Sequence, residues 1–221
     1  MKFIISILTL LFLMFDTSAF ASKWYANYLK DKCAECIECC YKGKVKRVSF
    51  TQFDTALLEV ARTKCANARP ERVDMELLKD LLSIEKRLNV PEKYRGAVLA
   101  AACRESGYNP LPRNGDGGKA KGLLQLHPWW EKRFKVNRAD PVASTIVWMS
   151  QILRSVPKAK RKCGKRRAFV SAWAWVASGP KGWRCRSPRH AGTLKRWHRA
   201  VRRSIETRRQ TDGTDYKRLT K

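Results

Sequence analysis

Residues 91–110 read PEKYRGAVLAAACRESGYNP, and this segment carries most of the information about the fold. Pro91 suits the first turn of a helix, where a missing N–H costs no hydrogen bond. Gly107 offers a C-terminal stop, and Asn109–Pro110 prevents the helix from continuing. Small and apolar residues share one face of this helix, and that face ends in an acid: Tyr94, Val98, Ala101, Ala102 and Glu105. We therefore expect a buried helix that carries Glu105 in its last turn.

Helical periodicity continues on both sides of this segment. Upstream, we expect one helix from Phe50 onward and a second over about 72–88. Downstream, a loop over 111–121 precedes a short helix near Leu123, and Asp140–Pro141 predicts a long helix that ends before Pro157. After a basic loop over 158–167, the segment 167–178 is apolar nearly all round and predicts a central buried helix. A last, arginine-rich helix is expected from Ser187–Pro188 to about Arg209, followed by a polar tail over 210–221. The fold class is therefore mainly α, with neither a repeat nor a convincing strand.

The N-terminus is typical of an export signal. Lys2 precedes an apolar run from Phe3 to Phe15, and Ala19-Phe20-Ala21 fits the cleavage pattern of a signal peptide. The run is shorter than the about 20 apolar residues that a membrane span needs, although an uncleaved anchor is the alternative. We expect a signal peptide over 1–21, a cysteine-rich extension over 22–48 and a helical domain over 49–209, so the protein is predicted to be secreted or periplasmic.

All eight cysteines follow the predicted signal peptide, and export makes disulfides the expected state. Cys163 and Cys185 flank the tryptophan-rich central helix, and we expect them to pair. The cluster Cys33, Cys36, Cys39 and Cys40 has zinc as its alternative, but one pair is adjacent and no histidine is near. The remaining pairings stay open, and we expect neither a metal nor a cofactor.

The formal net charge is +28, with 47 Lys and Arg against 19 Asp and Glu. Such a charge predicts a polyanionic partner. From Arg154 to Arg209 the only acid is Glu206, so this C-terminal region is expected to dock on an anionic envelope surface, with simple solvation of the charges as the alternative. Nothing resembles a base-reading module, so we expect no nucleic-acid partner, and we expect a monomer.

Glu105 is the candidate acid. It lies at the C-terminal end of an apolar helical face, where partial burial and the negative end of the helix dipole both favour the neutral carboxyl. A glycosidic leaving oxygen needs a donor that is still protonated near neutral pH. The alternative is a carboxylate that caps the helix or pairs with a basic neighbour such as Arg104.

Four motifs in order support the catalytic interpretation. Glu105-Ser106-Gly107-Tyr108-Asn109-Pro110 resembles the catalytic motif of soluble lytic transglycosylases, and Gly122-Leu123-Leu124-Gln125-Leu126 resembles that family's Gly-Leu-Met-Gln motif. Asp140–Pro141 then opens a helix as in the family, and residues 172–180, AWAWVASGP, resemble its Ala-Tyr-Asn-Ala-Gly-Pro segment. Together the motifs cover about residues 90–185.

The resemblance implies a lysozyme-like helical domain that cleaves peptidoglycan glycan strands at the bond between N-acetylmuramic acid and N-acetylglucosamine. It implies Glu105 as the acid/base and a 1,6-anhydro product. It also implies that Gln125 contacts the substrate, that Ser106 lies beside the acid, and that the backbone at Gly117, Gly118 and Gly122 approaches the sugar.

The chain departs from this family at one position and resembles a relative at another. Where the family has a tyrosine that bonds the catalytic glutamate, this chain has Trp175-Val176, and Trp175 is a candidate for contacting the substrate. Goose-type lysozymes carry a Gly-Asp pair that Gly115-Asp116 matches, so Asp116 is a candidate for positioning a water in a hydrolytic reaction. Their second aspartate corresponds here to His127. Asp116 as a simple turn residue is the alternative.

Aromatic residues flank these motifs. Tyr108, Trp129, Trp130 and Trp183 could stack on sugar rings, whereas Trp148, Trp173 and Trp197 have the helical spacing of core residues. Trp129 and Trp130 could equally be packing residues. The histidines, His127, His190 and His198, have no metal-binding spacing, and His198 is expected on a solvated basic helix. A second hypothesis is a cationic wall-binding protein that has lost catalysis.

Overall fold

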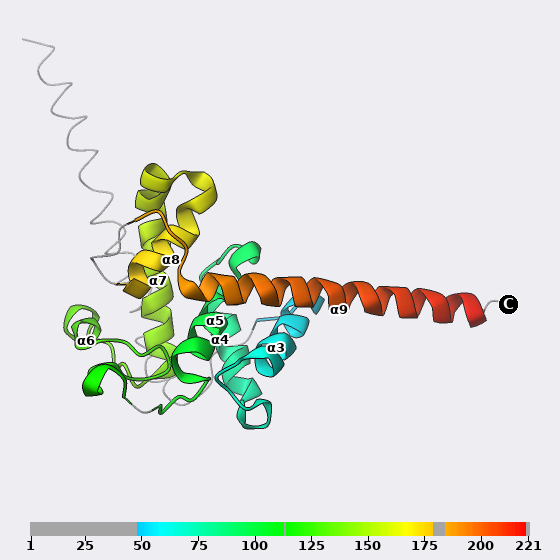
Figure 1. Cartoon of the computed structure of the whole chain (residues 1–221), viewed down its shortest axis with the longest axis horizontal. Coiled ribbons are helices and arrows are strands. Elements are labelled where there is room, and N and C mark those ends of the chain that lie inside the picture. Colours follow the sequence, from blue (N-terminus) through cyan, green and yellow to red (C-terminus); the bar gives the residue numbers. More distant parts are fainter. Residues whose placement is uncertain (1–47, 113, 179–183, 220–221) are drawn as a thin grey trace, which may run out of the picture. The chain divides into compact units, whose positions relative to one another are not determined.

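The computed structural model describes residues 48–112, 114–178 and 184–219, with the backbone alone for 209–219. The predicted signal peptide, nearly all of the cysteine-rich extension, its four clustered cysteines and Trp183 lie outside the described residues. The described chain is mainly helical, as predicted (Figure 1). Its α-helices are α3 (Gln52–Lys64), α4 (Met75–Arg87), α5 (Ala97–Ser106), α6 (Pro128–Phe134), α7 (Pro141–Cys163), α8 (Ala168–Ser178) and α9 (Arg189–Leu219), and its short 3₁₀ turns are η1 (Pro70–Arg72), η2 (Glu92–Tyr94), η3 (Asp116–Gly118) and η4 (Lys165–Arg167).

Helix α5 lies at the centre of the domain, and α3, α4 and α9 pack against it (Figure 1). Every residue from Ala97 to Cys103 is buried, because small side chains let the neighbouring helices approach closely. A disulfide between Cys65 and Cys103 ties the end of α3 to this helix. The helix stops at Gly107, whose φ of 61° is left-handed, as the sequence predicts.

The start of α5 differs from the prediction. Pro91 precedes the separate turn η2, and α5 begins only at Ala97, after Gly96 with a φ of 89°. The reason is a carboxylate from another helix. Glu85 of α4 is fully buried and accepts hydrogen bonds from the backbone N–H groups of Gly96 and Val98. It therefore satisfies donors at the N-terminus of α5 that have no partner inside the helix. Burial raises the pKa of Glu85 to about 7, although these two hydrogen bonds act in the opposite direction.

A second buried acid fixes the start of α3. Asp54 forms a reciprocal capping box with Thr51 and also binds Lys86 and Arg95. Burial alone would raise the pKa of Asp54, but the hydrogen bonds from Lys86 and Thr51 and the charge of Arg95 hold it below its usual value. This cluster joins α3 to α4 and to the turn before α5.

Helices α7 and α8 pack side by side, and α7 also packs against α4 (Figure 1). Asp140 caps α7 through the N–H groups of Val142 and Ala143, as Asp140–Pro141 predicts. The predicted end before Pro157 is wrong, because α7 continues through the proline to Cys163. Burial of Ala159 and the disulfide from Cys163 to Cys185 stabilise this last part. That disulfide confirms the predicted pair. The expected basic loop over 158–167 is therefore mostly helix.

The segment 167–178 forms a helix as predicted, whereas the segment near Leu123 does not. The apolar segment 167–178 forms the buried helix α8, where Trp173 is fully buried and Trp148 of α7 packs edge-on against it, so both are core residues as predicted. The short helix expected near Leu123 is wrong. Residues 115–126 instead form a loop with two isolated β-bridges, Gly115 with Ala120 and Lys121 with Leu126, and helix α6 begins at Pro128.

Helix α9 begins at Arg189, close to the predicted start, and its backbone remains helical to Leu219, well beyond the predicted end near Arg209. Trp197 is buried, as predicted. The expectation for His198 is wrong: its ring is buried, packs edge-on against Phe53, and its Nε2 lies 2.8 Å from the Arg95 carbonyl oxygen. None of the helices in the described part of the chain is long and apolar enough to cross a membrane.

Candidate active site

A cavity of about 510 Å³ opens at the C-terminal end of α5. Its wall combines side chains from α5, the loop 115–127, α6, α7, the end of α8 and the first turn of α9. The lining residues are Ala101, Glu105, Gly115, Asp116, Ala120, Leu124, Gln125, Leu126, His127, Trp129, Trp130, Trp148, Val176, Ala177, Ser178 and His190. The structure therefore brings Glu105, Asp116, Gln125 and Trp129, all predicted from the sequence, to one cavity.

Glu105 bonds to a histidine in this cavity. Its Oε1 lies 2.8 Å from His190 Nε2, and the Glu105 side chain remains 35 % exposed while that of His190 is 9 % exposed. The imidazole stacks on Trp173, with ring centroids 5.8 Å apart and planes 14° apart. Because the core tryptophan fixes the ring, His190 holds one carboxylate oxygen and leaves the rest of the carboxyl at the cavity mouth.

The surroundings of His190 indicate which nitrogen carries the proton. Its Nδ1 is buried and has no hydrogen-bond partner within the described residues. A proton on Nδ1 would leave a buried N–H donor unpaired, whereas a proton on Nε2 leaves only a lone pair unpaired. The second arrangement costs less free energy, so the geometry favours donation from His190 Nε2–H to Glu105 Oε1.

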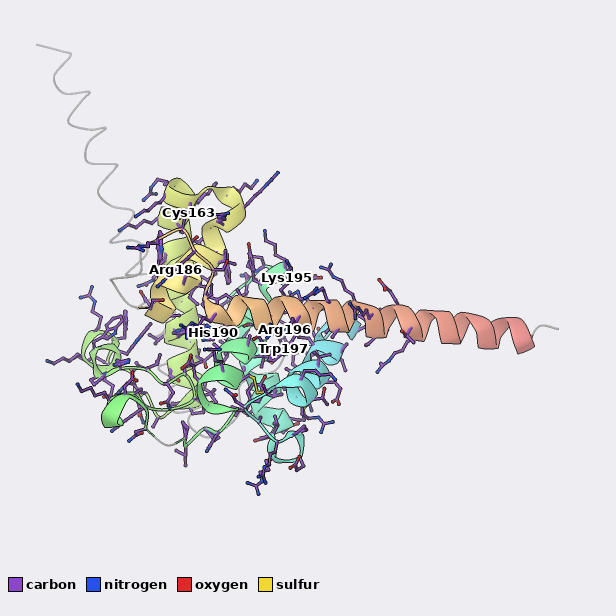
Figure 2. All side chains as sticks on the ribbon, viewed as in Figure 1. Cys163, Arg186, His190, Lys195, Arg196 and Trp197 are labelled. Carbon is purple, nitrogen blue, oxygen red and sulfur yellow. A yellow bond between two sulfur atoms is a disulfide. The ribbon has the colours of Figure 1, made fainter. Side chains whose placement is uncertain are left out.

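His190 is not among the site residues that the sequence predicts. The sequence places Trp175, in the motif at 172–180, where the family that this chain resembles has a tyrosine that bonds the glutamate. The structure instead places Trp175 in the core, where its indole N–H donates to the Arg184 carbonyl oxygen. Trp175 does not line the cavity, and its bond fixes the segment that leads to His190. One feature of the sequence does point to His190: Ser187–Pro188 predicts a helix start, so His190 is expected in an ordered first turn. In the structure His190 lies in the first turn of α9 (Figure 2).

Gln125 lines the cavity, but its amide also holds the loop together. Its Oε1 accepts from the Gly115 N–H at 2.9 Å, and its Nε2 donates to the Gly122 carbonyl at 3.0 Å. The predicted approach of Gly122 to a sugar has another explanation: a Cβ there would lie 1.8 Å from the Arg138 carbonyl oxygen. Gly122 is therefore required for backbone packing. Cβ atoms at Gly117 and Gly118 would meet nothing within 4 Å, so this part of the loop is open to solvent.

Asp116 and His127 form a second pair in the same cavity. Asp116 Oδ2 lies 2.9 Å from His127 Nε2, and their side chains are 67 % and 47 % exposed. The backbone of Asp116 is left-handed, with a φ of 47°, so the loop turns at this residue. His127 is thus bound to Asp116, the acid predicted to position a water.

The remaining predicted contacts divide between the cavity and the core. Trp129 is 43 % exposed at the cavity, whereas Trp130 is 4 % exposed and packs on Phe134 while lining the cavity floor. Tyr108 is buried and donates its hydroxyl to the Ala61 carbonyl, so the prediction that it stacks on a sugar is wrong. Burial raises the pKa of Tyr108 well above its usual value. Ser106 donates its hydroxyl to the Ala102 carbonyl and is not part of the cavity wall.

A second hollow of about 750 Å³ meets the first at Glu105. The two share Glu105, Ala177, Ser178 and His190. The rest of the second hollow is polar and basic: Asn67, Arg104, Arg186, Ser187, Pro188 and Arg189. Arg104 thus faces this hollow, and the carboxylate pairs with His190 rather than with Arg104. Glu105 lies at the junction of an aromatic hollow and an arginine-lined hollow.

The arrangement places one carboxyl group, with a fixed hydrogen-bond partner, where two hollows meet. Within residues 48–112, 114–178 and 184–219, no group of three or more His, Cys, Asp or Glu side chains could hold a metal ion. Comparison with protein-family models, with curated proteins and with solved structures found no match.

Proposed function

We propose that this protein cleaves peptidoglycan glycan strands at the bond between N-acetylmuramic acid and N-acetylglucosamine, with Glu105 as its acid/base, on a lysozyme-like helical domain. The observation that carries the proposal is the position of Glu105. Its carboxyl lies at the junction of two hollows, bonds to His190 and shares one cavity with the exposed ring of Trp129. A saccharide crossing this junction would present a glycosidic oxygen to the acid, and a sugar ring could stack on Trp129.

The chemistry needs one carboxyl group that first donates and then accepts a proton. No described residue bonds Glu105 Oε2, so this oxygen is free to donate to the glycosidic oxygen as the bond from the muramyl C1 breaks. The leaving N-acetylglucosamine takes that proton. The resulting carboxylate then accepts the proton of the muramyl C6 hydroxyl, whose oxygen bonds to C1 and closes the 1,6-anhydro ring. His190 Nε2–H stabilises the carboxylate stage through Oε1.

Hydrolysis by the same acid is the second candidate, and the Asp116–His127 pair favours it. In this reaction a water, rather than the C6 hydroxyl, attacks C1 and loses a proton to a base. An imidazole that is bound to a carboxylate suits that role, and both side chains line the cavity that contains Glu105. The product would have a reducing end.

The product itself separates the two reactions. Purified sacculi are digested with wild-type protein, and the released muropeptides are weighed by mass spectrometry. Anhydro ends identify a transglycosylase, whereas reducing ends identify a muramidase, and Asp116→Asn should then stop release. The variant Glu105→Gln, which lacks the acid, is the negative control for muropeptide release. Wall binding by wild type without any release would contradict both reactions and favour the non-catalytic wall-binding protein.

We propose further that the protein acts outside the cytoplasm and is held on an anionic envelope surface. Two disulfides are expected in an oxidising compartment. A basic tip formed by the end of α7 and η4 exposes Lys160, Arg161, Lys162, Lys165, Arg166 and Arg167, and α9 exposes Lys195, Arg196, Arg199, Arg202 and Arg203 (Figure 2). Their charges would attract a wall or membrane that carries carboxylates or phosphates.

A further inference from the structure

We propose that the arginine-lined hollow beside Glu105 binds a carboxylate of the stem peptide that muramic acid carries, so that the protein prefers peptide-bearing strands to bare ones. This inference rests on the proposed function and names a substrate feature that the acid alone does not require. It is carried by Arg104, Arg186 and Arg189, which line one hollow of about 750 Å³.

All three arginines are exposed, and no ion pair joins any of them to an acid within the described residues. Among the residues that the structure describes, Glu105 is the only acid that lines their hollow, and its Oε1 binds His190. Like charges that share a hollow repel one another, so a bound anion would lower the energy of the cluster. Guanidinium groups also match the two oxygens of a carboxylate.

Two other elements support the same site. Helix α9 begins at Arg189, so the positive end of its dipole points toward the hollow. The segment before it is fixed by the Cys163–Cys185 disulfide and by the bond from the Trp175 indole to the Arg184 carbonyl. Arg186 therefore directly follows these two anchored positions and precedes the start of α9 (Figure 2).

The position beside Glu105 favours a stem-peptide carboxylate as the anion, because the hollow and the candidate cleavage site share this residue. In the proposed reaction the sugar whose C1 bond is cleaved is muramic acid, and its lactyl group carries the stem peptide. That peptide supplies free carboxylates to an arginine-lined hollow next to the acid. The hydroxyls of Ser178 and Ser187 and the amide of Asn67 line the same hollow and could bind peptide groups.

The test uses soluble strands in three forms: with native stem peptides, with the stem carboxylates converted to amides by carbodiimide and ammonia, and with the peptides removed by an amidase. The protein is tested as wild type and as Arg104→Gln/Arg186→Gln/Arg189→Gln. The matched control is Arg69→Gln/Arg72→Gln/Arg133→Gln, which removes three exposed arginines that do not line either hollow. Both kcat/KM and the Kd of the strands for Glu105→Gln protein are measured.

We expect wild type and the control variant to cleave native strands roughly tenfold or more faster than amidated or bare strands, because only native strands offer the arginines a charged hydrogen-bond acceptor. The triple variant of the hollow should bring that ratio close to one. Equal rates of wild type on native and amidated strands would overturn the inference, as would a control variant that loses discrimination equally. If wild type cleaves no strand, the proposed function fails, but the Kd comparison still tests the hollow.

Discussion

The buried imidazole of His190 lies 2.8 Å from the carboxylate of Glu105, although 85 positions separate them in the sequence. Helix α5 delivers the acid at its C-terminal end and α9 delivers the histidine in its first turn. Trp173 of α8 supports the imidazole from behind. Three helices therefore determine the geometry of one hydrogen bond. The proposed catalytic role of Glu105 relies on this bond, because it holds Oε1 and leaves Oε2 for the substrate.

The first prediction concerns His190 as a positioning residue. His190→Phe keeps a ring against Trp173 but removes the donor to Glu105, so kcat should fall roughly ten- to a hundredfold while KM changes little. His190→Gln retains an N–H donor and should recover part of kcat. Steady-state kinetics on soluble strands check both variants. A Phe variant with the kcat of wild type, or a Gln variant no better than Phe, would refute this role.

The second prediction concerns the pH dependence of stability. Burial raises the pKa of Glu85 to about 7 from its ordinary 4.5. Between these values the folded state holds a proton that the unfolded state has lost, so this group's contribution to stability is complete below about pH 4.5 and is lost as the pH rises to about 7. Urea unfolding of wild type and Glu85→Gln across this window should show their difference in unfolding free energy changing in favour of Gln as the pH rises. A constant difference would contradict the prediction.

The structure shows which features the sequence could predict. Apolar periodicity identified α8 as a buried helix, and capping residues identified the start of α7, because both signals act locally. Pro157 misled the prediction because tertiary contacts at Ala159 and the disulfide at Cys163 outweigh the lost backbone bond. The motif identified Glu105, Asp116 and Gln125, but it could not identify His190, whose contact with Glu105 depends on the packing of α9 against α5.

A similar reason explains the residues whose roles changed. Tyr108 belongs to the motif at Glu105, yet the left-handed backbone after the helix, with a φ of 64°, directs its ring into the core toward Ala61. His198 lies in a helix rich in arginine, yet it faces α3 and packs against Phe53. Neither direction can be read from composition, because the tertiary partner decides which face is buried.

The third prediction concerns the Cys163–Cys185 disulfide. Replacing both cysteines by alanine should lower the unfolding free energy by about 3 kcal/mol, since the bond closes a loop of 22 residues. The rate of strand cleavage should also fall in the variant that is still folded, because the disulfide helps to fix the segment that precedes His190. Activity is compared with wild type at a temperature where circular dichroism shows both proteins folded. Full activity of the folded variant would show that this segment needs no covalent anchor.

The fourth prediction concerns the basic tip, Lys160 to Arg167. Changing its six cations to glutamine should weaken binding to sacculi at low salt and leave cleavage of soluble strands unaffected, since the tip does not line the groove. Raising the salt from about 0.1 M to about 1 M shortens the Debye length from about 10 Å to about 3 Å and should release wild type in the same way. Sedimentation with sacculi measures both effects. If the binding of wild type to sacculi did not change with the salt concentration, electrostatic docking would be excluded.

The central claim is that the Glu105 carboxyl transfers the proton that breaks the glycan strand. Its most direct measurement is the rate at which purified strands are cut by wild type, by Glu105→Gln and by the control Glu71→Gln, whose side chain is exposed on η1. We predict that Glu105→Gln cuts at least roughly a hundredfold more slowly than wild type, in line with the contribution of a general acid, while Glu71→Gln equals wild type. Equal rates for Glu105→Gln and wild type would contradict the account.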